Sequence, residues 1–585
     1  MNTLQKHTHQ TTTLYKDPHN PHHHLSRGLT HHELGFSDLA AADAYRALSL
    51  LDSVVDPEVC EFHARRRVDL DSDGGQDGNG NGNVNMNGEE GDEEDEEDGF
   101  VPITQDEYGA LIGGVYVLLV RSLVDCGCYR DAFDFCARGL ELLRSKGQQQ
   151  QQDEENVSVL EEQMRVIKKV YISRKGLGEH EDHEINASAL PAQGFARRVL
   201  YPWNHHEPDR KAPEELDLLN ERLKDVAPKC EVRAVALPVL HTANPNPEKD
   251  AEKDTKKEGE EEVSIQLGLF AKEDIPAGEI ILRESSMLTA TNRLHDDLCD
   301  ACNAPLPSLS TAAADGSGGP VACDGCDDTI FCSQRCHDTA QETYHGAVCG
   351  LLEGLESIGK DIPDARDKAD YLYLLLLGRA LAMAATQEKH PLELPEVKYI
   401  WGDFHDYTPP TTTTTTQETK HQPGDGILPF SFHLNILQPM RILEEMALDP
   451  YAALPTYDTW ILNTLYAKFR GTASGRLSTW DGGPELCAVH PLWCLANHSC
   501  APNVRWEWGG EITFSVRGVE ERVSWGASSG AAAGQEKEFD GIRKDEEILN
   551  HYCDIGLDVK ERREWARGAL GGMCLCPRCV FEAGE

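Results

Sequence analysis

Apolar positions in the first third of the chain recur with the period of an α-helix. Two such runs lie between residues 106 and 145. The first has an apolar side chain every three or four residues, at Tyr108, Ile112, Tyr116, Leu119 and Leu123. Spacing of this kind places the side chains on one face of a helix. Gly127 interrupts the run, and a second apolar run follows it. The pattern predicts a pair of helices, with flanking helices over residues 36–55 and 156–173.

The second run combines small and aromatic residues, at Tyr129, Ala132, Phe133, Cys136, Gly139 and Leu140. This pattern resembles a tetratricopeptide repeat hairpin. Only one such unit can be recognised, so an ordinary helical bundle is the alternative. Both interpretations predict an all-α region over residues 36–175 that contains acidic and Gln-rich linkers.

Beyond residue 176 the helical period gives way to short apolar runs bounded by turns. A short helix is expected over residues 214–223 and a strand over residues 231–237. Residues 268–281 and 541–549 each carry a turn followed by an apolar run, so both are expected to form hairpin strands of one sheet. A further hairpin is predicted where Gly509-Gly510 joins residues 504–508 to residues 511–516.

Several stretches have too few apolar residues to form a packed core. Residues 1–35 are rich in His, Thr and Asn and are predicted to be a disordered tail, with a metal-binding histidine tract as the alternative. Residues 70–99 and the glutamine run at 148–152 are expected to be linkers. Three more stretches, residues 244–262, 409–426 and 526–534, are expected to be surface loops inserted into a fold that tolerates them.

Charge and cysteine content narrow the class of protein. Acidic residues number 100 against 55 Lys and Arg, a formal net charge of −45, which argues against nucleic acid as the main ligand because phosphate binding requires clustered basic residues. No apolar run reaches the ~18 residues of a membrane-spanning helix. The chain has 19 cysteines and a polar N-terminal segment without a secretory signal, so we expect a reducing compartment, the nucleus or the cytosol.

Eight cysteine and histidine residues in the middle of the chain are spaced in short pairs: Cys299-x2-Cys302, Cys323-x2-Cys326, Cys332-x3-Cys336 and His345-x3-Cys349. Thiolates and imidazoles in such pairs are the ligands of tetrahedral zinc, and eight of them fill two closed structural sites. The alternative is a set of free or disulfide-bonded cysteines. The spacing predicts a small zinc module that folds around its metal, but it does not decide which pairs share an ion.

A second cluster lies towards the C-terminus. Residues 497–503 read Asn-His-Ser-Cys-Ala-Pro-Asn, and Tyr552 follows Glu546-Glu547-Ile548 shortly afterwards. The chain ends with Cys574-x-Cys576-x2-Cys579. Three cysteines make an incomplete tetrahedral site, so Cys500 is the candidate for the fourth ligand if the chain folds back.

These motifs together are similar to those of the SET-and-MYND family of protein lysine methyltransferases, in which a MYND zinc finger interrupts a SET domain. The resemblance covers about residues 230–585. It implies an α+β fold, with a SET-type β fold interrupted by the finger and by a helical insert, and with a cysteine-rich post-SET tail. The expected boundaries are residues 176–229 for a connector, 230–298 and 481–555 for the two SET halves, 299–349 for the finger, 350–480 for the insert and 556–585 for the tail.

The resemblance also assigns roles to residues. It implies a cross-braced finger, with one zinc on Cys299, Cys302, Cys332 and Cys336 and another on Cys323, Cys326, His345 and Cys349. A third zinc would join Cys500 to Cys574, Cys576 and Cys579, which gives about three zinc ions per chain, one for each four-ligand set. Asn497 and His498 match the loop that holds S-adenosylmethionine, Gly268 and Leu269 match the turn whose backbone approaches this cofactor, and Tyr552 matches the catalytic tyrosine.

The implied activity is methylation of a lysine in a protein or peptide partner, such as a histone tail. Three departures from the family pattern favour an alternative, an adaptor or transcriptional regulator with weak or no activity. Gln266 stands within the cofactor turn, residues 466–469 lack the expected Asn, and Leu570 and Gly572 stand where aromatic residues commonly wall the lysine channel. In such an adaptor the finger would bind a proline-rich peptide and the helical region would bind peptides in a groove.

The remaining cysteines have no family motif. Cys487, His490 and Cys494 lie just before the Asn497 loop and could bind metal, but small buried thiols are common. The others are expected to be structural: Cys60, Cys126, Cys128, Cys136, Cys230 and Cys553.

Overall fold

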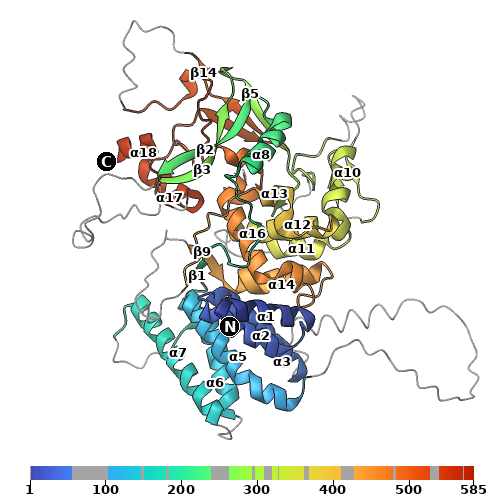
Figure 1. The fold of residues 1–585 in the computed structure, drawn as a ribbon, viewed down its shortest axis with the longest axis vertical. Coiled ribbons are helices and arrows are strands. Elements are labelled where there is room, and N and C mark those ends of the chain that lie inside the picture. The colour runs from blue at the N-terminus through green and yellow to red at the C-terminus, as the bar shows by residue number, and fades with distance from the viewer. Residues whose placement is uncertain are drawn as a thin grey trace, which may run out of the picture. The chain divides into compact units, whose positions relative to one another are not determined.

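A computed structural model of the chain contains both helices and strands (Figure 1). It describes residues 2–55, 103–145, 151–178, 184–238, 263–292, 297–308, 319–326, 329–360, 368–409, 427–478, 482–526, 539–570 and 572–584. The chain divides into two compact units. Unit 1 comprises residues 1–197, 408–416 and 428–459, and unit 2 comprises residues 198–407, 417–427 and 460–585.

Unit 1 is built mainly of helices. They are α1 (Thr3–Lys16), α2 (Pro21–Glu33), α3 (Ser37–Val55), α5 (Gln105–Cys126), α6 (Tyr129–Ser145) and α7 (Gln151–Lys175). The predicted helix pair is confirmed as α5 and α6, and the predicted flanking helices correspond to α3 and α7. Gly127 ends α5 in the left-handed conformation, with φ of 82°, which a glycine adopts without a Cβ clash. Gln151 and Gln152 belong to α7, whereas the rest of the predicted glutamine linker lies outside the described residues.

The core of unit 1 explains the small-and-aromatic pattern. A Cβ atom on Gly139 would lie 3.0 Å from Tyr116 and 3.1 Å from Leu160, so this glycine lets three helices pack closely. Cys136 is fully buried and directs its thiol towards the carbonyl of Leu160 at 3.2 Å. These contacts suit both a helical bundle and a tetratricopeptide hairpin, and the tetratricopeptide assignment therefore stays a prediction.

A segment expected in the SET insert belongs to unit 1 instead. Strand β9 (Ile427–Ser431) pairs with β1 (Gln193–Arg197), and it continues into a π-helix (His433–Leu437), α14 (Gln438–Glu445) and α15 (Leu454–Tyr457). Phe430, Phe432 and Ile436 lie in the same apolar cluster as the residues of α3, α5 and α6. Their side chains fill the helical core, so the insert predicted over residues 350–480 is divided between the two units.

The prediction of a disordered tail over residues 1–35 is wrong, because α1 and α2 occupy this stretch. His7, His24 and His31 are at most 4% exposed. His31 Nδ1 lies 3.0 Å from a carboxylate oxygen of Asp43, and His7 Nε2 lies 3.0 Å from His31 Nε2. These histidines are core residues, because they are buried against Asp43 and against one another. Composition alone could not distinguish this arrangement from a solvated tract.

Arg27 is the centre of the buried charges in unit 1. Its guanidinium donates to both oxygens of Asp43, at 2.9 and 2.6 Å, and to Asp458 at 2.6 Å. All three side chains are at most 3% exposed. The arginine therefore connects α2 to α3 and to the end of α15.

We expect Arg27→Met to destabilise unit 1 by about 3–5 kcal/mol, because it leaves two buried carboxylates without their cation. Urea unfolding of the full chain, followed by hydrogen exchange in α2 and α3, measures the loss. Lys6→Ala is the control, since Lys6 pairs with Glu33 at 3.4 Å on the surface and such pairs contribute only about 0.2–1 kcal/mol. Equal effects of the two substitutions would contradict a stabilising role for the buried network.

Unit 2 contains the strands that the sequence predicts. Strand β2 (Cys230–Pro238) pairs antiparallel with β3 (Val263–Ala271), and β5 (Ile280–Glu284) pairs with β13 (Ile512–Val516), which pairs with β12 (Val504–Trp508). The hairpin around Gly509-Gly510 is thus confirmed. A third sheet has the order β10 (Ser474–Leu477), β11 (Pro484–Ala488) and β6 (Thr289–Thr291).

The two similar segments on either side of the cysteine-rich module lie side by side, as expected. Strand β4 (Ile275–Pro276) pairs with β14 (Gly541–Ile542), and Phe270 forms an antiparallel bridge with Glu547. Gly541 is needed here because a Cβ atom would lie 2.1 Å from the carbonyl oxygen of Ile275. Gly268 lies within β3 and not in the predicted turn, and these pairings bring it close to the segment that precedes Tyr552.

The helices of unit 2 surround these sheets. They are α8 (Pro213–Val226), α10 (Gln334–Thr343), α11 (Leu352–Lys360), α12 (Lys368–Thr386), α13 (Pro395–Lys398), α16 (Thr459–Thr472), α17 (Val559–Leu570) and α18 (Pro577–Ala583). By length and composition α5 and α12 could each cross a membrane, but 56% of each apolar window is buried inside the structure. Such burial is typical of a core helix.

Parts of the predicted loops lie outside the described residues. They are the linker at 70–99, the charged insert at 244–262, residues 410–426 of the threonine-rich stretch and residues 527–534 of the small-residue stretch.

Candidate functional site

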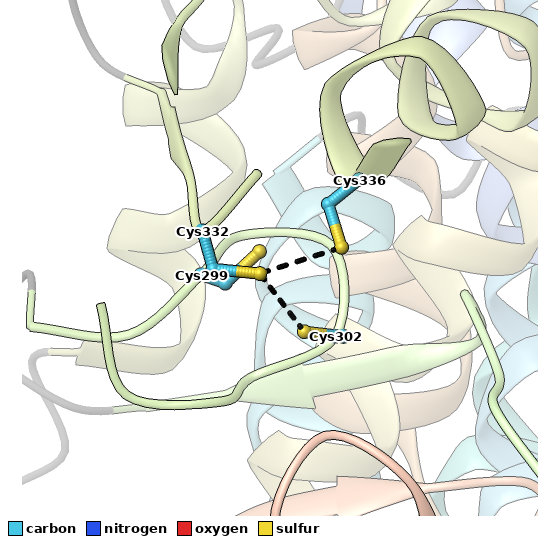
Figure 2. A group of neighbouring side chains, drawn as sticks. All are labelled: Cys299, Cys302, Cys332 and Cys336. Atoms are coloured by element: carbon cyan, nitrogen blue, oxygen red, sulfur yellow. Dashed lines mark hydrogen bonds between the residues drawn. The ribbon is translucent and has the colours of Figure 1, made fainter. Parts of the chain in front are cut away.

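The structure brings the predicted metal ligands of the module together in two groups of four. Cys299, Cys302, Cys332 and Cys336 have sulfur atoms within 4.8 Å of one another. Figure 2 shows the four thiols close together, with dashed lines for the contacts of Cys332 with Cys302 and Cys336. Cys299 and Cys302 lie on a tight turn in which the Asn303 N–H donates to the Cys299 carbonyl at 2.9 Å. The other two cysteines lie after strand β8 (Ile330–Phe331) and in the first turn of α10.

The second group is formed by Cys323, Cys326, His345 and Cys349. His345 is fully buried, and its Nε2 lies 3.2 Å from Cys323 and 3.5 Å from Cys326. The N–H of Gly325 and the amide of Gln341 donate to the sulfur of Cys323 at 3.4 and 3.3 Å. Hydrogen bonds of this kind stabilise a metal-bound thiolate. The first pair of cysteines thus groups with the third pair, and the second with the fourth, as in a cross-braced finger.

The tail cysteines converge on Cys500. The Cys500 sulfur lies 3.4 Å from Cys579 and 4.0 Å from Cys574, and Cys576 completes the group. Arg578 donates to the carbonyl of Cys500 at 2.7 Å, so α18 is fastened directly to the loop that precedes β12. Two groups contain four thiols and the third contains three thiols and an imidazole, which fits zinc in a closed tetrahedral site.

The loop at Asn497 is held against the middle of strand β3. The side-chain amide of Asn497 donates to the Leu267 carbonyl at 3.0 Å and to a Glu547 oxygen at 2.7 Å. A Cβ on Gly268 would lie 2.7 Å from that Glu547 oxygen and 3.1 Å from the Asn497 amide. A larger residue at this position would therefore displace the side chains of Glu547 and Asn497. The structure brings Gly268 and Asn497 together as predicted, with Leu269 fully buried next to them.

Two backbone hydrogen bonds align this loop with the strand that leads to Tyr552. The Asn550 N–H donates to the Asn497 carbonyl at 2.8 Å, and the Ser499 N–H donates to the Asn550 carbonyl at 2.7 Å. The two segments run parallel, with His498 bridging to Asn550. Asn550 is fully buried, and its amide nitrogen has no hydrogen-bond partner among the described residues.

Tyr552 is hydrogen-bonded to His498 and to the carbonyl of Ala496. The Tyr552 hydroxyl donates to the Ala496 carbonyl at 2.9 Å, and the Tyr552 N–H donates to His498 Nδ1 at 3.0 Å. His498 Nδ1 is therefore the acceptor nitrogen, and Nε2 carries the proton that points at the Cys500 sulfur 3.3 Å away. Burial raises the pKa of the Tyr552 hydroxyl well above its usual value. The neutral phenol is thus a fixed hydrogen-bond donor at neutral pH.

Both nitrogens of the His498 ring are hydrogen-bonded within the protein. They connect the Tyr552 backbone to a tail thiol. Burial also lowers the pKa of His498 to about 4, so the ring is neutral at physiological pH. Both ring nitrogens of His498 therefore have partners within the protein, and its cofactor role stays a prediction.

Glu284 is a residue of the site that sequence reasoning missed. It ends β5 and is only 5% exposed, yet its carboxylate accepts the N–H groups of Leu492 and Trp493 at 3.1 and 2.7 Å. These residues begin the segment that supplies the Ala496 carbonyl and Asn497. The only signal in the sequence is an acidic residue at the end of the run Ile280-Ile281-Leu282.

The stability of unit 2 should depend on the charge of Glu284. Burial raises the pKa of Glu284 from 4.5 to about 7, so the folded state retains a proton that the unfolded state loses above pH 4.5. The contribution of Glu284 to the free energy of unfolding is therefore lost as pH rises from 4.5 to 7, by about 3 kcal/mol in total. Glu284→Gln removes this dependence. We expect the stability advantage of wild type over the variant to fall by about 3 kcal/mol between pH 5 and pH 8 in urea denaturation; a constant difference would contradict the prediction.

The positions that depart from the family pattern have structural roles. Gln266 pairs with Val235 within the β2–β3 hairpin. Lys468 is fully buried, pairs with Glu207 at 2.8 Å and donates to the carbonyls of Val397 and Ile400. Leu570 packs against the tail cysteines. Gly572 is described, but nothing in the structure assigns it a contact with a ligand.

The remaining cysteines and His490 differ in whether they join a group of metal-type residues. Among the described residues, Cys487, His490 and Cys494 join no metal-type group, and each is held inside the fold. Cys60 lies outside the described residues. Cys553 lies beside the tail site, because it forms a group with His498 and Cys500 whose ligand atoms lie within 4.8 Å of one another.

Comparison with known proteins identifies the fold around this loop. No curated protein matches the chain. SET domains are generally protein lysine methyltransferases, and they use S-adenosylmethionine as methyl donor. The part of the chain that matches the SET family model contains Gly268, the cysteine-rich module and Asn497, but it ends before Tyr552 and the tail cysteines. Residues 266–522 of this chain match the family model of the SET domain.

Proposed function

We propose that the protein is an S-adenosylmethionine-dependent protein lysine methyltransferase. The observation that carries this proposal is the convergence of Gly268, Asn497 and Tyr552, which come from three distant segments of unit 2. Asn497 holds β3 at the residue before Gly268, and the hydroxyl of Tyr552 donates to the carbonyl of Ala496, next to Asn497. A buried phenol beside oriented carbonyls is what a methyl transfer site requires.

Each of these residues has a role in the proposed reaction. The cofactor supplies an activated methyl group, which passes to a neutral lysine amine by in-line displacement. Alignment of the amine is the main requirement, and no acid or covalent nucleophile is needed. Tyr552 and the Ala496 carbonyl would orient the amine and exclude water. Gly268, Leu269, Asn497 and the backbone of His498 would hold the cofactor, and the buried Asn550 amide offers a further donor.

Zinc would keep this arrangement in place. The tail group fastens Cys500 to the C-terminal helices, two residues from His498, and the two groups of the module would fold a segment with little core of its own. The proposed substrate is a lysine in a protein or peptide, a histone tail included, in the nucleus or the cytosol. The resemblance of the module to a MYND finger remains part of this proposal.

Calorimetry of the full chain with S-adenosylmethionine tests the proposal. We expect one site per chain with a Kd in the micromolar range, as is usual for enzyme substrates, and a similar site for the demethylated product. Asn497→Ala is the matched variant, because it breaks the hydrogen bonds to Leu267 and Glu547, and it should weaken binding at least about tenfold. Absence of binding at millimolar cofactor would rule out the enzyme.

Leu570 and Gly572 support a second candidate, an adaptor without activity. A groove on unit 1, lined by Leu140, Met164 and the Arg144–Glu161 pair, would hold a peptide, and the module would hold a proline-rich one. Partner capture that depends on Cys332 but not on Tyr552 would favour the adaptor. Methylation of the captured partner, abolished by Tyr552→Phe, would exclude a purely adaptor role.

A further inference from the structure

The tail site has more potential ligands than one zinc ion can use. Tetrahedral zinc takes four ligands, and Cys500, Cys574, Cys576 and Cys579 supply them. Cys553 is a fifth thiol, 2% exposed, in a second group that shares Cys500. Its sulfur lies within 4.8 Å of the Cys500 sulfur and of a His498 ring nitrogen. The cluster therefore contains one thiol that can react without being a ligand.

We propose that Cys553 and Cys500 form a redox pair: a hydroperoxide converts them to a disulfide, which removes Cys500 from the tail zinc site. This inference rests on the zinc ligands of the proposed function and adds a modification site to them. The two sulfur atoms lie within 4.8 Å, and a disulfide bond of about 2.05 Å forms by rotation of the two side chains. Cys576 is partly exposed, which gives a small oxidant access to the cluster.

The reaction balances with the hydroperoxide as the only oxidant. The sulfur of one cysteine attacks the peroxide oxygen, the O–O bond breaks, and a sulfenic acid and water form. The second thiol then attacks the sulfenic sulfur, the S–S bond forms, and a second water leaves. The two sulfurs lose two electrons in all, and the peroxide gains them. The zinc ion keeps its charge and leaves because only three thiolates remain to hold it.

The position of Cys553 connects this chemistry to the proposed catalytic residue. Cys553 follows Tyr552 directly in the chain, and Tyr552 depends on His498 for its N–H hydrogen bond. His498 in turn donates to the sulfur of Cys500, the atom that the disulfide would take. Formation of the disulfide therefore removes a hydrogen-bond acceptor from His498 and moves the backbone next to Tyr552. Oxidation should reduce turnover through these two contacts.

The test uses the full chain, after its zinc content has been measured. Hydrogen peroxide is added, zinc release is followed with a chromophoric chelator, and disulfides are mapped by mass spectrometry. We expect one zinc ion to leave together with a Cys500–Cys553 disulfide, and a reductant with added zinc to reverse both. Cys553→Ser and Cys553→Ala should each slow this release at least about tenfold, since the resolving thiol is gone. Cys230→Ser, which removes a buried thiol outside every group, should behave as wild type.

Two results would overturn the proposal. One is release of the first zinc at the wild-type rate in both Cys553 variants, and the other is a disulfide map without Cys553. Cofactor binding, measured separately on the reduced protein, decides the proposed enzyme function. A failure of the redox pair is therefore distinguishable from a failure of the methyltransferase assignment.

Discussion

Tyr552→Phe is expected to lower the turnover of the proposed lysine methylation about 10²–10³-fold and to leave the Kd for S-adenosylmethionine within about twofold. The hydroxyl is the only atom removed, and a positioned hydrogen-bond donor contributes an effect of this size to the transition state. The ring keeps its contact with His498, whose centroid lies 5.2 Å away. Transfer of a labelled methyl group to a histone or peptide substrate, together with calorimetry, measures the two quantities.

A control is needed because the substitution also leaves the Ala496 carbonyl without its donor. Tyr399→Phe serves this purpose, since Tyr399 is a 9% exposed tyrosine in the same apolar cluster of unit 2 as Leu495 and Ala496. We expect it to retain wild-type turnover. Equal turnover in wild type and Tyr552→Phe would remove Tyr552 from the proposed role. A large loss in the Tyr399 variant would instead point to a general packing effect.

Cys332→Ser is expected to lower the zinc content from about three ions per chain to about two. Cys332 contacts Cys302 at 3.8 Å and Cys336 at 3.5 Å, so its loss breaks one four-ligand group. The module has little else to hold it, because β7 (Val321–Ala322) and β8 form only a two-residue pairing. Since structural zinc supplies about 10–16 kcal/mol to small modules, the described residues 297–349 should become sensitive to protease and exchange their amide hydrogens rapidly.

Elemental analysis of the purified chain and limited proteolysis measure these effects, with Cys230→Ser as the control that keeps all its zinc. A wild-type content near two would remove the tail site from the proposal, and an unchanged content in Cys332→Ser would remove the first group of the module. The second group should keep its ion in the variant, because His345 and its three cysteines share no ligand with Cys332.

Short-range patterns carried most of the successful predictions. The α5–α6 pair follows from helical spacing and from Gly127, and the β12–β13 hairpin follows from Gly509-Gly510, since both depend on neighbours in the chain. The cysteine groups could be predicted because ligand spacing is a local constraint, whereas their cross-braced pairing required the family resemblance. The structure places Asn497 next to Gly268, although the sequence separates them widely.

The predictions that failed concern residues that are buried together although they lie far apart in the sequence. The histidines of α1 and α2 are buried beside the ion pair of Arg27 and Asp43. No local pattern in the sequence indicates that these residues are neighbours. Glu284 is similar, since its two N–H donors lie more than 200 residues further along the chain. The proximity of Cys553 to Cys500 was not predicted for the same reason, because a lone cysteine has no ligand spacing and only the fold brings the two thiols within 4.8 Å.

The partnership of Arg27 with Asp458 also constrains how the protein is made. The two residues are separated by 431 positions, and a ribosome adds about 5–20 residues per second. Roughly 20–90 s therefore pass between the synthesis of the arginine and that of its second carboxylate. During that time the N-terminal helices lack one of their buried charges and the apolar residues of β9 and α14, so unit 1 completes its folding only after most of unit 2 has been synthesised.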